Sequence, residues 1–232
     1  MSEPKLRIAE IFISIQGEGI WAGVPSTFVR VSGCNLRCVW CDTPYASWSP
    51  EGPVHDLGEI ASQVPSGVNH VVLTGGEPML FDAIEPLAHL LHERGHTITI
   101  ETAGTVFREL PCDLMSISPK LANSTPPEES GWRERHEATR ADLSALRQLI
   151  ERYACQLKFV VNPEAVGDIA EIEGLLVSLP PVAADRVLLM AEGVTAEVQL
   201  RRQRMLVDAC ISRGWRLSPR LHIDLFGNTR GT

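Results

Sequence analysis

Positions 33–43 of this chain read Gly33-Cys34-Asn35-Leu36-Arg37-Cys38-Val39-Trp40-Cys41-Asp42-Thr43 and hold three cysteines, with no fourth cysteine nearby. An iron–sulfur cube held by thiolates needs a ligand at each of its irons. Three thiolates from one short loop leave one iron free for a group that does not belong to the protein. The spacing therefore indicates a 4Fe–4S cluster on Cys34, Cys38 and Cys41, with one open position for a substrate or a cofactor.

Two other readings of the cysteines remain open. A structural zinc site also gathers cysteines at short spacing, but it closes with four protein ligands, for which His55 or Cys112 is the candidate. A disulfide framework is a weaker alternative, because six cysteines in 232 residues are sparse. Since nothing at the N-terminus resembles a secretory signal, we expect a reducing compartment and a cytoplasmic location.

Composition narrows the class of protein. With 232 residues, 44% of them hydrophobic, the chain can bury a sizeable core, and we expect one domain over residues 1–232. The net charge of −8, from 21 basic and 29 acidic residues, argues against broad nucleic-acid binding. No apolar run has the length that crosses a bilayer. A small-molecule substrate is therefore expected, without direct nucleic-acid or membrane binding.

Apolar β-branched runs alternate with helical patterns, which is typical of β–α units and a parallel sheet. Strands are expected at residues 27–31, 70–74, 97–101, 113–118, 156–161 and 186–190. The alternation permits a doubly wound sheet, but the number of units favours an α/β partial (β/α) barrel of about six parallel strands. A full barrel takes roughly 250 residues.

Helix signals lie between these strands. Asp82 is expected to cap a helix over residues 83–93, and a helix is expected from Thr139, with Asp142 three residues on, to about residue 153. Two more helices are expected to open at Asn162-Pro163 and at Thr195. Residues 121–140 interrupt the pattern, and we interpret them as a solvated excursion or a lid.

Unusual residues follow the expected strands at their C-terminal ends, where parallel α/β folds place their sites. The cysteine loop follows the first strand, and Lys158 lies within the fifth. The remaining loops are Thr74-Gly75-Gly76-Glu77-Pro78, Glu101-Thr102-Ala103-Gly104, Ser118-Pro119-Lys120 and Met190-Ala191-Glu192-Gly193. Their convergence predicts one site on one rim of the sheet.

Cys34-x-x-x-Cys38-x-Trp40-Cys41, followed by Gly75-Gly76-Glu77-Pro78, resembles the radical S-adenosylmethionine (SAM) superfamily. The resemblance implies a 4Fe–4S cluster whose free iron chelates the amino and carboxylate groups of SAM. One electron then cleaves the sulfonium and yields a 5′-deoxyadenosyl radical. It also implies that the Gly-Gly-Glu loop holds the methionine amino group by a close backbone approach, which needs glycine.

A narrower resemblance extends over nearly the whole chain. Residues 10–19 and 23–30, the Cys41-Asp42-Thr43 segment and residues 116–120 are similar to the 7-carboxy-7-deazaguanine synthase family. That family contracts the ring of 6-carboxy-5,6,7,8-tetrahydropterin with loss of ammonia, on the route to queuosine and other 7-deazapurines. The resemblance implies a lyase that reuses SAM and depends on Mg²⁺, a homodimer, and flavodoxin or ferredoxin as electron donor.

The same resemblance assigns binding roles but no catalytic residue. For the pterin it implies Ile15, Gln16, Gly17, Arg30, Thr74 and His222. For SAM it implies Trp40, Cys41, Asp42, Gly76, Glu101, Ser118, Pro119 and Lys120, and for Mg²⁺ it implies Thr43. These roles suit the side chains, because Arg30 presents a planar fork to a carboxylate, Gln16 both donates and accepts, and Thr43 is a hard oxygen donor.

The C-terminal end departs from the family pattern. In relatives a short tail folds back over the pterin and offers a histidine, and Pro219-Arg220-Leu221-His222 has this form, but residues 223–232 follow it here. The alternative function is a glycyl-radical-enzyme activating enzyme, which shares the cysteine loop and the SAM site but does not need Gln16, Arg30 or Thr43. A simple electron carrier leaves the Gly-Gly-Glu loop unexplained.

Overall fold

The computed structural model describes residues 4–232. Its strands are β1 (Lys5–Ile15), β2 (Pro25–Val31), β3 (Val54–Asp56), β4 (His70–Gly75), β5 (Thr97–Thr102), β6 (Leu114–Ile117), β7 (Cys155–Val161), β8 (Val187–Ala191) and β9 (Arg216–Ser218). Its α-helices are α1 (Leu57–Ser62), α2 (Ile84–Glu93), α3 (Arg133–Ala141), α4 (Ser144–Arg152), α5 (Asp168–Val177), α6 (Ala196–Arg213) and α7 (Leu221–Phe226).

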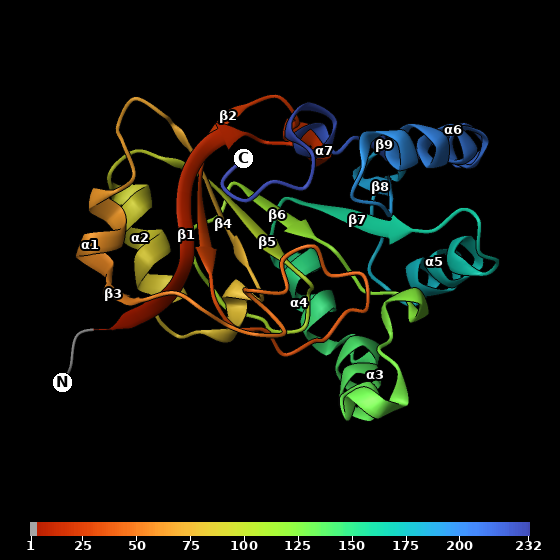
Figure 1. Cartoon of the computed structure of the whole chain (residues 1–232), viewed down its shortest axis with the longest axis horizontal. Coiled ribbons are helices and arrows are strands. Elements are labelled where there is room, and N and C mark those ends of the chain that lie inside the picture. The colour runs from red at the N-terminus through yellow and green to blue at the C-terminus, as the bar shows by residue number, and fades with distance from the viewer. Residues whose placement is uncertain (1–3) are drawn as a thin grey trace.

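The described strands form one nine-stranded sheet in the order β3-β1-β2-β4-β5-β6-β7-β8-β9 (Figure 1). β2 and β4 to β9 run parallel, whereas β1 pairs antiparallel with both β2 and β3. Because the order ends at β3 on one side and at β9 on the other, the sheet stays open. The chain is an α/β protein with a partial (β/α) barrel, as its sequence predicts.

The core lies between the sheet and the helices that pack on it. α2 packs on β5, α5 on β7, and α6 on β8 and β9. β4, β7 and β8 are buried along nearly their whole length, as expected for parallel strands covered on both faces. Within residues 4–232, no helix is both long and apolar enough to cross a membrane.

The six expected strands are present as β2 and β4 to β8, with bounds that differ by one or two residues. The sequence did not predict β1, β3 and β9 as strands. β3 and β9 have three residues each, too few for a period to show. β1 has only two buried side chains, Leu6 and Ile8, and most of its other side chains are partly exposed. The alternation of apolar and polar residues that marks a strand is therefore absent from most of its length.

The helix predictions were right in part. Thr195 caps α6 as expected, since its Oγ1 accepts a hydrogen bond from Val198 N at 3.4 Å. α2 is also present, but the Asp82 cap was wrong, because Asp82 pairs with Arg108 at 2.6 Å and Ala83 is the N-cap residue. The helix expected at Asn162-Pro163 begins only at α5.

The segment before α4 differs from the prediction. The helix expected from Thr139 is interrupted at Asp142, whose Oδ1 accepts a hydrogen bond from Ser144 N at 2.9 Å, so α3 ends before it and α4 starts after it. Residues 121–140 are only in part the solvated excursion that was expected, because Glu128 and Glu129 are exposed but other residues of the segment are buried. His136 in α3 is fully buried, and its Nδ1 accepts a hydrogen bond from Arg37 N in the cysteine loop at 3.1 Å. This segment therefore supports the cysteine loop.

Candidate active site

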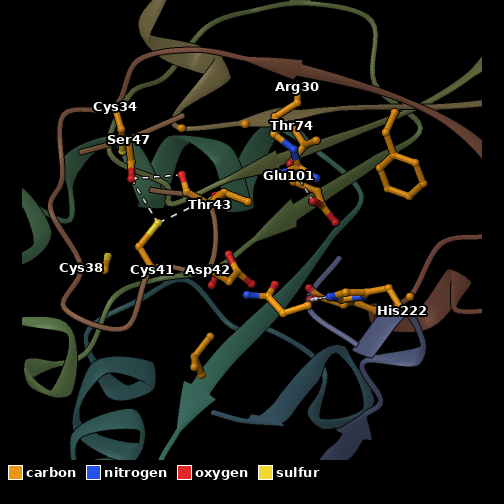
Figure 2. Close-up of a pocket in the computed structure, with 18 of the residues that line it drawn as sticks. Arg30, Cys34, Cys38, Cys41, Asp42, Thr43, Ser47, Thr74, Glu101 and His222 are labelled. Carbon is orange, nitrogen blue, oxygen red and sulfur yellow. Dashed lines mark hydrogen bonds and ion pairs between the residues drawn. The ribbon is translucent and has the colours of Figure 1, made fainter. Parts of the chain in front are cut away.

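A cavity of about 450 Å³ opens at the C-terminal ends of the parallel strands (Figure 2). β2, β4, β5, β6, β7 and β8 each contribute lining residues, together with the cysteine loop and the C-terminal tail. The strand-end loops thus converge on one rim, as predicted. Residues 121–140 contribute no side chain to the lining, so the structure does not support the alternative that they form a lid.

The three cysteines of the loop all line this cavity (Figure 2). Cys41 Sγ lies 3.1 Å from Ser47 Oγ and 3.8 Å from Thr43 Oγ1. Burial raises the pKa of Cys34 to about 12 and the pKa of Cys38 to about 11. At neutral pH these two thiols are therefore protonated in the metal-free protein, and iron must displace their protons in order to bind.

Neighbouring side chains fix the backbone of the cysteine loop. Trp48 Nε1 donates to Cys38 O at 3.0 Å, and Arg37 Nη1 donates to Cys34 O at 2.8 Å. Trp40 Nε1 donates to Asn123 Oδ1 at 3.1 Å, which ties the loop to the segment that carries α3. These contacts hold the loop, and all three cysteines line the cavity.

The donor set fits an iron–sulfur cube better than a zinc ion. Within residues 4–232, no three side chains of Cys, His, Asp or Glu lie close enough to hold a single metal ion. A cube spreads its thiolates over separate irons, so its ligands stand farther apart. His55 and Cys112, the candidates for a fourth zinc ligand, do not line the cavity.

Gly75 and Gly76 allow β4 to end against the cysteine loop. A Cβ atom on Gly76 would lie 2.1 Å from Gly33 O, and one on Gly75, where φ is +132°, would lie 2.1 Å from Val31 O. The close approach of the chain's own backbone therefore requires glycine at both positions. The resemblance had instead implied that the approach of bound SAM requires it. Glu77 is fully buried and accepts hydrogen bonds from Thr102 Oγ1 and Ala103 N at 2.8 Å each, so its carboxylate anchors the loop after β5.

Glu101 connects residues predicted for SAM with residues predicted for the pterin. Its Oε1 accepts a hydrogen bond from Gln16 Nε2 at 3.2 Å, and its Oε2 accepts one from Thr74 Oγ1 at 2.8 Å. Lys158 Nζ lies 3.7 Å from Oε1. A carboxylate has further lone pairs, so Glu101 can still accept from a ligand hydroxyl while these bonds hold it in place.

A buried ionic network lies beside Glu101. Glu18 pairs with Lys158 through Oε2 and with Arg220 Nε through Oε1 at 3.2 Å, and Arg220 Nη2 pairs with Asp42. Burial raises the pKa of Glu18, but the charges of Lys158 and Arg220 outweigh it and hold this pKa well below its usual range. His222 Nε2 lies 3.9 Å from Glu18 Oε1, and burial lowers the pKa of this histidine. These ion pairs connect three segments of the chain, namely the loop after β1 that holds Glu18, β7 that holds Lys158, and the start of α7 next to Arg220.

Arg30 lines the same cavity at the end of β2, beside Thr74 of β4 (Figure 2). Its Nε donates to Glu10 Oε1 at 2.6 Å, and Tyr45 OH donates to the same oxygen at 2.8 Å. Within residues 4–232, the hydrogen bonds of the Arg30 side chain go through Nε alone. Both Nη groups are therefore left to bind a carboxylate in parallel.

Comparison with known proteins identifies the family. Residues 28–153 match the model of the radical SAM superfamily. The chain is 45% identical to 7-carboxy-7-deazaguanine synthase of Rhodopirellula baltica, with 100% of this chain and 90% of that protein covered. The chain belongs to the 7-carboxy-7-deazaguanine synthase family. It is also 44% identical to the synthase of Halobacterium salinarum, with 99% of this chain and 93% of that protein covered.

A solved structure agrees with this assignment. The crystal structure of QueE from Escherichia coli matches with a TM-score of 0.69 at 27% identity, covering 92% of this chain and 93% of that one. The partial barrel, expected from the number of β–α units, and the radical SAM cysteine loop, expected from the sequence resemblance, are therefore confirmed. Membership in the synthase family also implies a 4Fe–4S cluster, SAM and Mg²⁺ as cofactors, and the donor set described above fits the cluster.

The structure brings together nearly all residues to which the synthase resemblance assigns a role. Those that line the cavity are Ile15, Gln16, Gly17, Arg30, Cys34, Cys38, Trp40, Cys41, Asp42, Thr43, Thr74, Gly76, Glu101, Ser118, Lys120 and His222. Pro119 is the exception, because it is buried beneath the lining between its two neighbours. The individual roles in binding remain predictions.

Sequence reasoning missed several residues of the synthase cavity, namely Glu10, Glu18, Tyr45, Ser47 and the tail at residues 228–232. A signal existed for one part of the ionic network. Lys158 stands in the apolar run Leu157-Lys158-Phe159-Val160-Val161, and a lysine in a buried strand requires a buried carboxylate. Nothing in the sequence showed that this carboxylate is Glu18.

Proposed function

We propose that this chain is a 7-carboxy-7-deazaguanine synthase. It converts 6-carboxy-5,6,7,8-tetrahydropterin to 7-carboxy-7-deazaguanine and ammonia, as a radical SAM lyase of queuosine and 7-deazapurine biosynthesis. The observation that carries the proposal is the placement of Arg30 and Gln16 in the same cavity as Cys34, Cys38 and Cys41. A carboxylate-binding fork and an amide thus face the position where the radical is generated.

The residues of the chain supply binding and orientation in this proposal. When bound, the cluster and SAM supply the 5′-deoxyadenosyl radical. Cys34, Cys38 and Cys41 hold the cluster, and Thr43 offers its hydroxyl to Mg²⁺. Arg30 takes the substrate carboxylate, while Gln16, fixed on Glu101, binds the pterin edge. No residue of the chain is assigned a proton transfer in this proposal.

The activating-enzyme alternative lacks comparable support. It requires neither Arg30 nor Gln16 in the cavity, and the relatives that cover this chain are named as synthases. An anaerobic turnover assay with reconstituted protein, reductant, SAM, Mg²⁺ and the carboxylated pterin tests the proposal. We expect 7-carboxy-7-deazaguanine in excess over the SAM consumed. Formation of 5′-deoxyadenosine without this product would contradict the assignment and keep only the radical chemistry.

The finer points of the proposal concern partners and location. The enzyme acts on a small molecule and needs a reductant, as the radical SAM family does. We infer that flavodoxin or ferredoxin delivers the electron, that the chain forms a homodimer as one domain, and that it works in the cytoplasm. The electron donor and the dimer rest on the family resemblance, and the single domain and the location rest on the composition and sequence of the chain. Size-exclusion chromatography with light scattering tests the dimer directly.

Replacement of Arg30 by alanine is expected to weaken binding of the carboxylated pterin by about 1.5–3 kcal/mol, because a charge-assisted bond to a carboxylate is lost. Tyr45 and Arg230 still bind Glu10 in this variant, so we expect the fold to survive. Calorimetric titration with the pterin measures the effect, and circular dichroism checks the fold. An unchanged dissociation constant would remove Arg30 from the substrate site.

Replacement of Thr43 by alanine is expected to raise the Mg²⁺ concentration for half-maximal activity by about tenfold or more, since a hard oxygen ligand is lost. Ser47→Ala is the matched control, because Ser47 also offers a hydroxyl beside Cys41 but is assigned no metal. Initial rates across a Mg²⁺ titration measure both variants. Equal midpoints for Thr43→Ala and the wild type would show that this hydroxyl does not bind the ion.

A further inference from the structure

The C-terminal tail reaches the same cavity by a path that the sequence did not reveal. After α7 the chain turns at Gly227 and passes back toward β1, where it ends (Figure 1). Residues 228–232 all line the cavity, as do Glu10 on β1 and Tyr45 after the cysteine loop. Residues 228–232 belong to the extension beyond His222, so the tail adds groups to the cavity that the family resemblance does not assign.

Arg230 attaches the tail to three separate segments. Its Nη1 pairs with Glu51, and its Nη2 donates to Ala9 O at 2.8 Å. Its Nε lies 3.4 Å from Glu10 Oε2, and its guanidinium stacks over the ring of Tyr45 at 4.1 Å. A side chain with contacts of this number and variety has a defined position, although about half of it stays exposed.

Glu10 connects Arg230 with Arg30. One oxygen of Glu10 accepts from Arg30 Nε at 2.6 Å, and the other faces Arg230. Glu10 is therefore the internal counter-ion of the arginine expected to bind the substrate carboxylate. A counter-ion that orients Arg30 also competes with a negatively charged substrate, so its own charge must be balanced from the opposite side.

The balance of charges depends on Arg230. Arg30 and Arg230 match Glu10 and Glu51 in number, so the cluster is neutral and Arg30 can attract an anion. Without Arg230, Arg30 would be the one guanidinium left to balance the charges of Glu10 and Glu51, and the cluster would carry a net negative charge beside the position of the substrate carboxylate. Such a charge repels an anionic ligand and leaves a neutral ligand unaffected.

We propose that Arg230 determines specificity for the carboxylated pterin, because it neutralises Glu10 and so leaves the Nη groups of Arg30 to the substrate carboxylate. This inference rests on the proposed function, since it takes the anion to be the carboxylate of the pterin. Arg230 is a positioning residue, because it acts on the substrate through Glu10 and Arg30. The tail is thus part of the recognition of the substrate.

The test compares two ligands on Arg230→Gln in the full-length, reconstituted protein under anaerobic conditions. We expect the dissociation constant for 6-carboxy-5,6,7,8-tetrahydropterin to rise about three- to tenfold, and the one for the same pterin without its carboxylate to stay unchanged. The KM is expected to rise with little change in kcat. Higher ionic strength should reduce the effect, because half of Arg230 is exposed.

Two further variants separate electrostatics from structure. Arg216→Gln is the matched control, since Arg216 is an exposed arginine that pairs with Asp185 on the far side of the sheet order, and it should affect neither ligand. The double variant Glu10→Gln/Arg230→Gln keeps the cluster neutral, because one acidic and one basic charge are removed together. Its dissociation constant for the carboxylated pterin should therefore stay much closer to the wild type than that of Arg230→Gln alone.

The outcomes distinguish the inference from the function that it rests on. Equal weakening of both ligands, or no weakening of the carboxylated one, overturns the role of Arg230 while the wild type still binds the carboxylated pterin. A wild type that shows no preference for the carboxylated pterin overturns the proposed function and this inference together. If Arg230→Gln does not fold, Glu10→Gln provides the test. The inference requires this variant to bind the carboxylated pterin at least as tightly as the wild type, and weaker binding overturns it.

Discussion

The Cys38→Ala variant is expected to lose its iron–sulfur cluster and all cleavage of SAM. Three thiols converge on the cavity, and a cube that has lost one of them keeps too few protein ligands to hold its irons. Because the radical is generated at the cluster, no part of the activity is expected to remain. Iron and sulfide analysis, visible absorption and the formation of 5′-deoxyadenosine measure the three consequences separately.

The matched control for this loss is Cys112→Ala. Cys112 is half-buried, and burial raises the pKa of its thiol as it does that of Cys38, but Cys112 lies outside the cavity, so its variant should keep the iron content and the activity of the wild type. Normal SAM cleavage by Cys38→Ala would contradict the assignment of Cys38 as a ligand of the cluster. Loss of iron in both variants would mean that the reconstitution depends on thiols in general.

Local patterns were sufficient for most of the fold and for much of the site. Each of the parallel strands β2 and β4 to β8 is a short run rich in apolar or β-branched residues, and its C-terminal end lies on the same rim as the ends of its neighbours. The strand ends near Arg30, Thr74 and Glu101 could therefore be placed together from their positions in the sequence alone. The cysteine loop then identified which rim carries the chemistry.

The parts that could not be predicted depend on contacts between distant segments. Lys158 and Glu18 are 140 residues apart, and Arg220 and Glu18 are 202 apart, so no local period relates them. The polar segment that contains α3 gave no local sign that His136 would be buried under Arg37. The role of the tail was also unpredictable from local sequence, because an arginine such as Arg230 is ordinarily a surface residue and its partner Glu10 lies far away in the sequence.

The Lys158→Met variant is expected to destabilise the fold by about 3–5 kcal/mol. Removal of one partner from a buried ion pair leaves an uncompensated charge in the interior, which costs this much in typical cases. Glu18 keeps Arg220, and Glu101 keeps Gln16 and Thr74, so the lower end of the range is the closer expectation. In a chain of this length, such a loss lowers the midpoint of thermal unfolding by roughly 6–20 °C.

The dependence on pH identifies Glu18 as the cause of this loss. The pKa of Glu18 in the folded protein is held below its unfolded value, so its carboxylate contributes stability above about pH 5 and loses it as the pH falls toward the folded pKa. The difference between Lys158→Met and the wild type should therefore be largest near neutral pH and shrink below about pH 4.5. Arg152→Gln, which breaks an exposed pair with Glu109, should leave the midpoint unchanged. A Lys158→Met difference that stays constant with pH would assign the loss to packing of the lysine stem, because only an ionic cost fades when Glu18 takes up a proton.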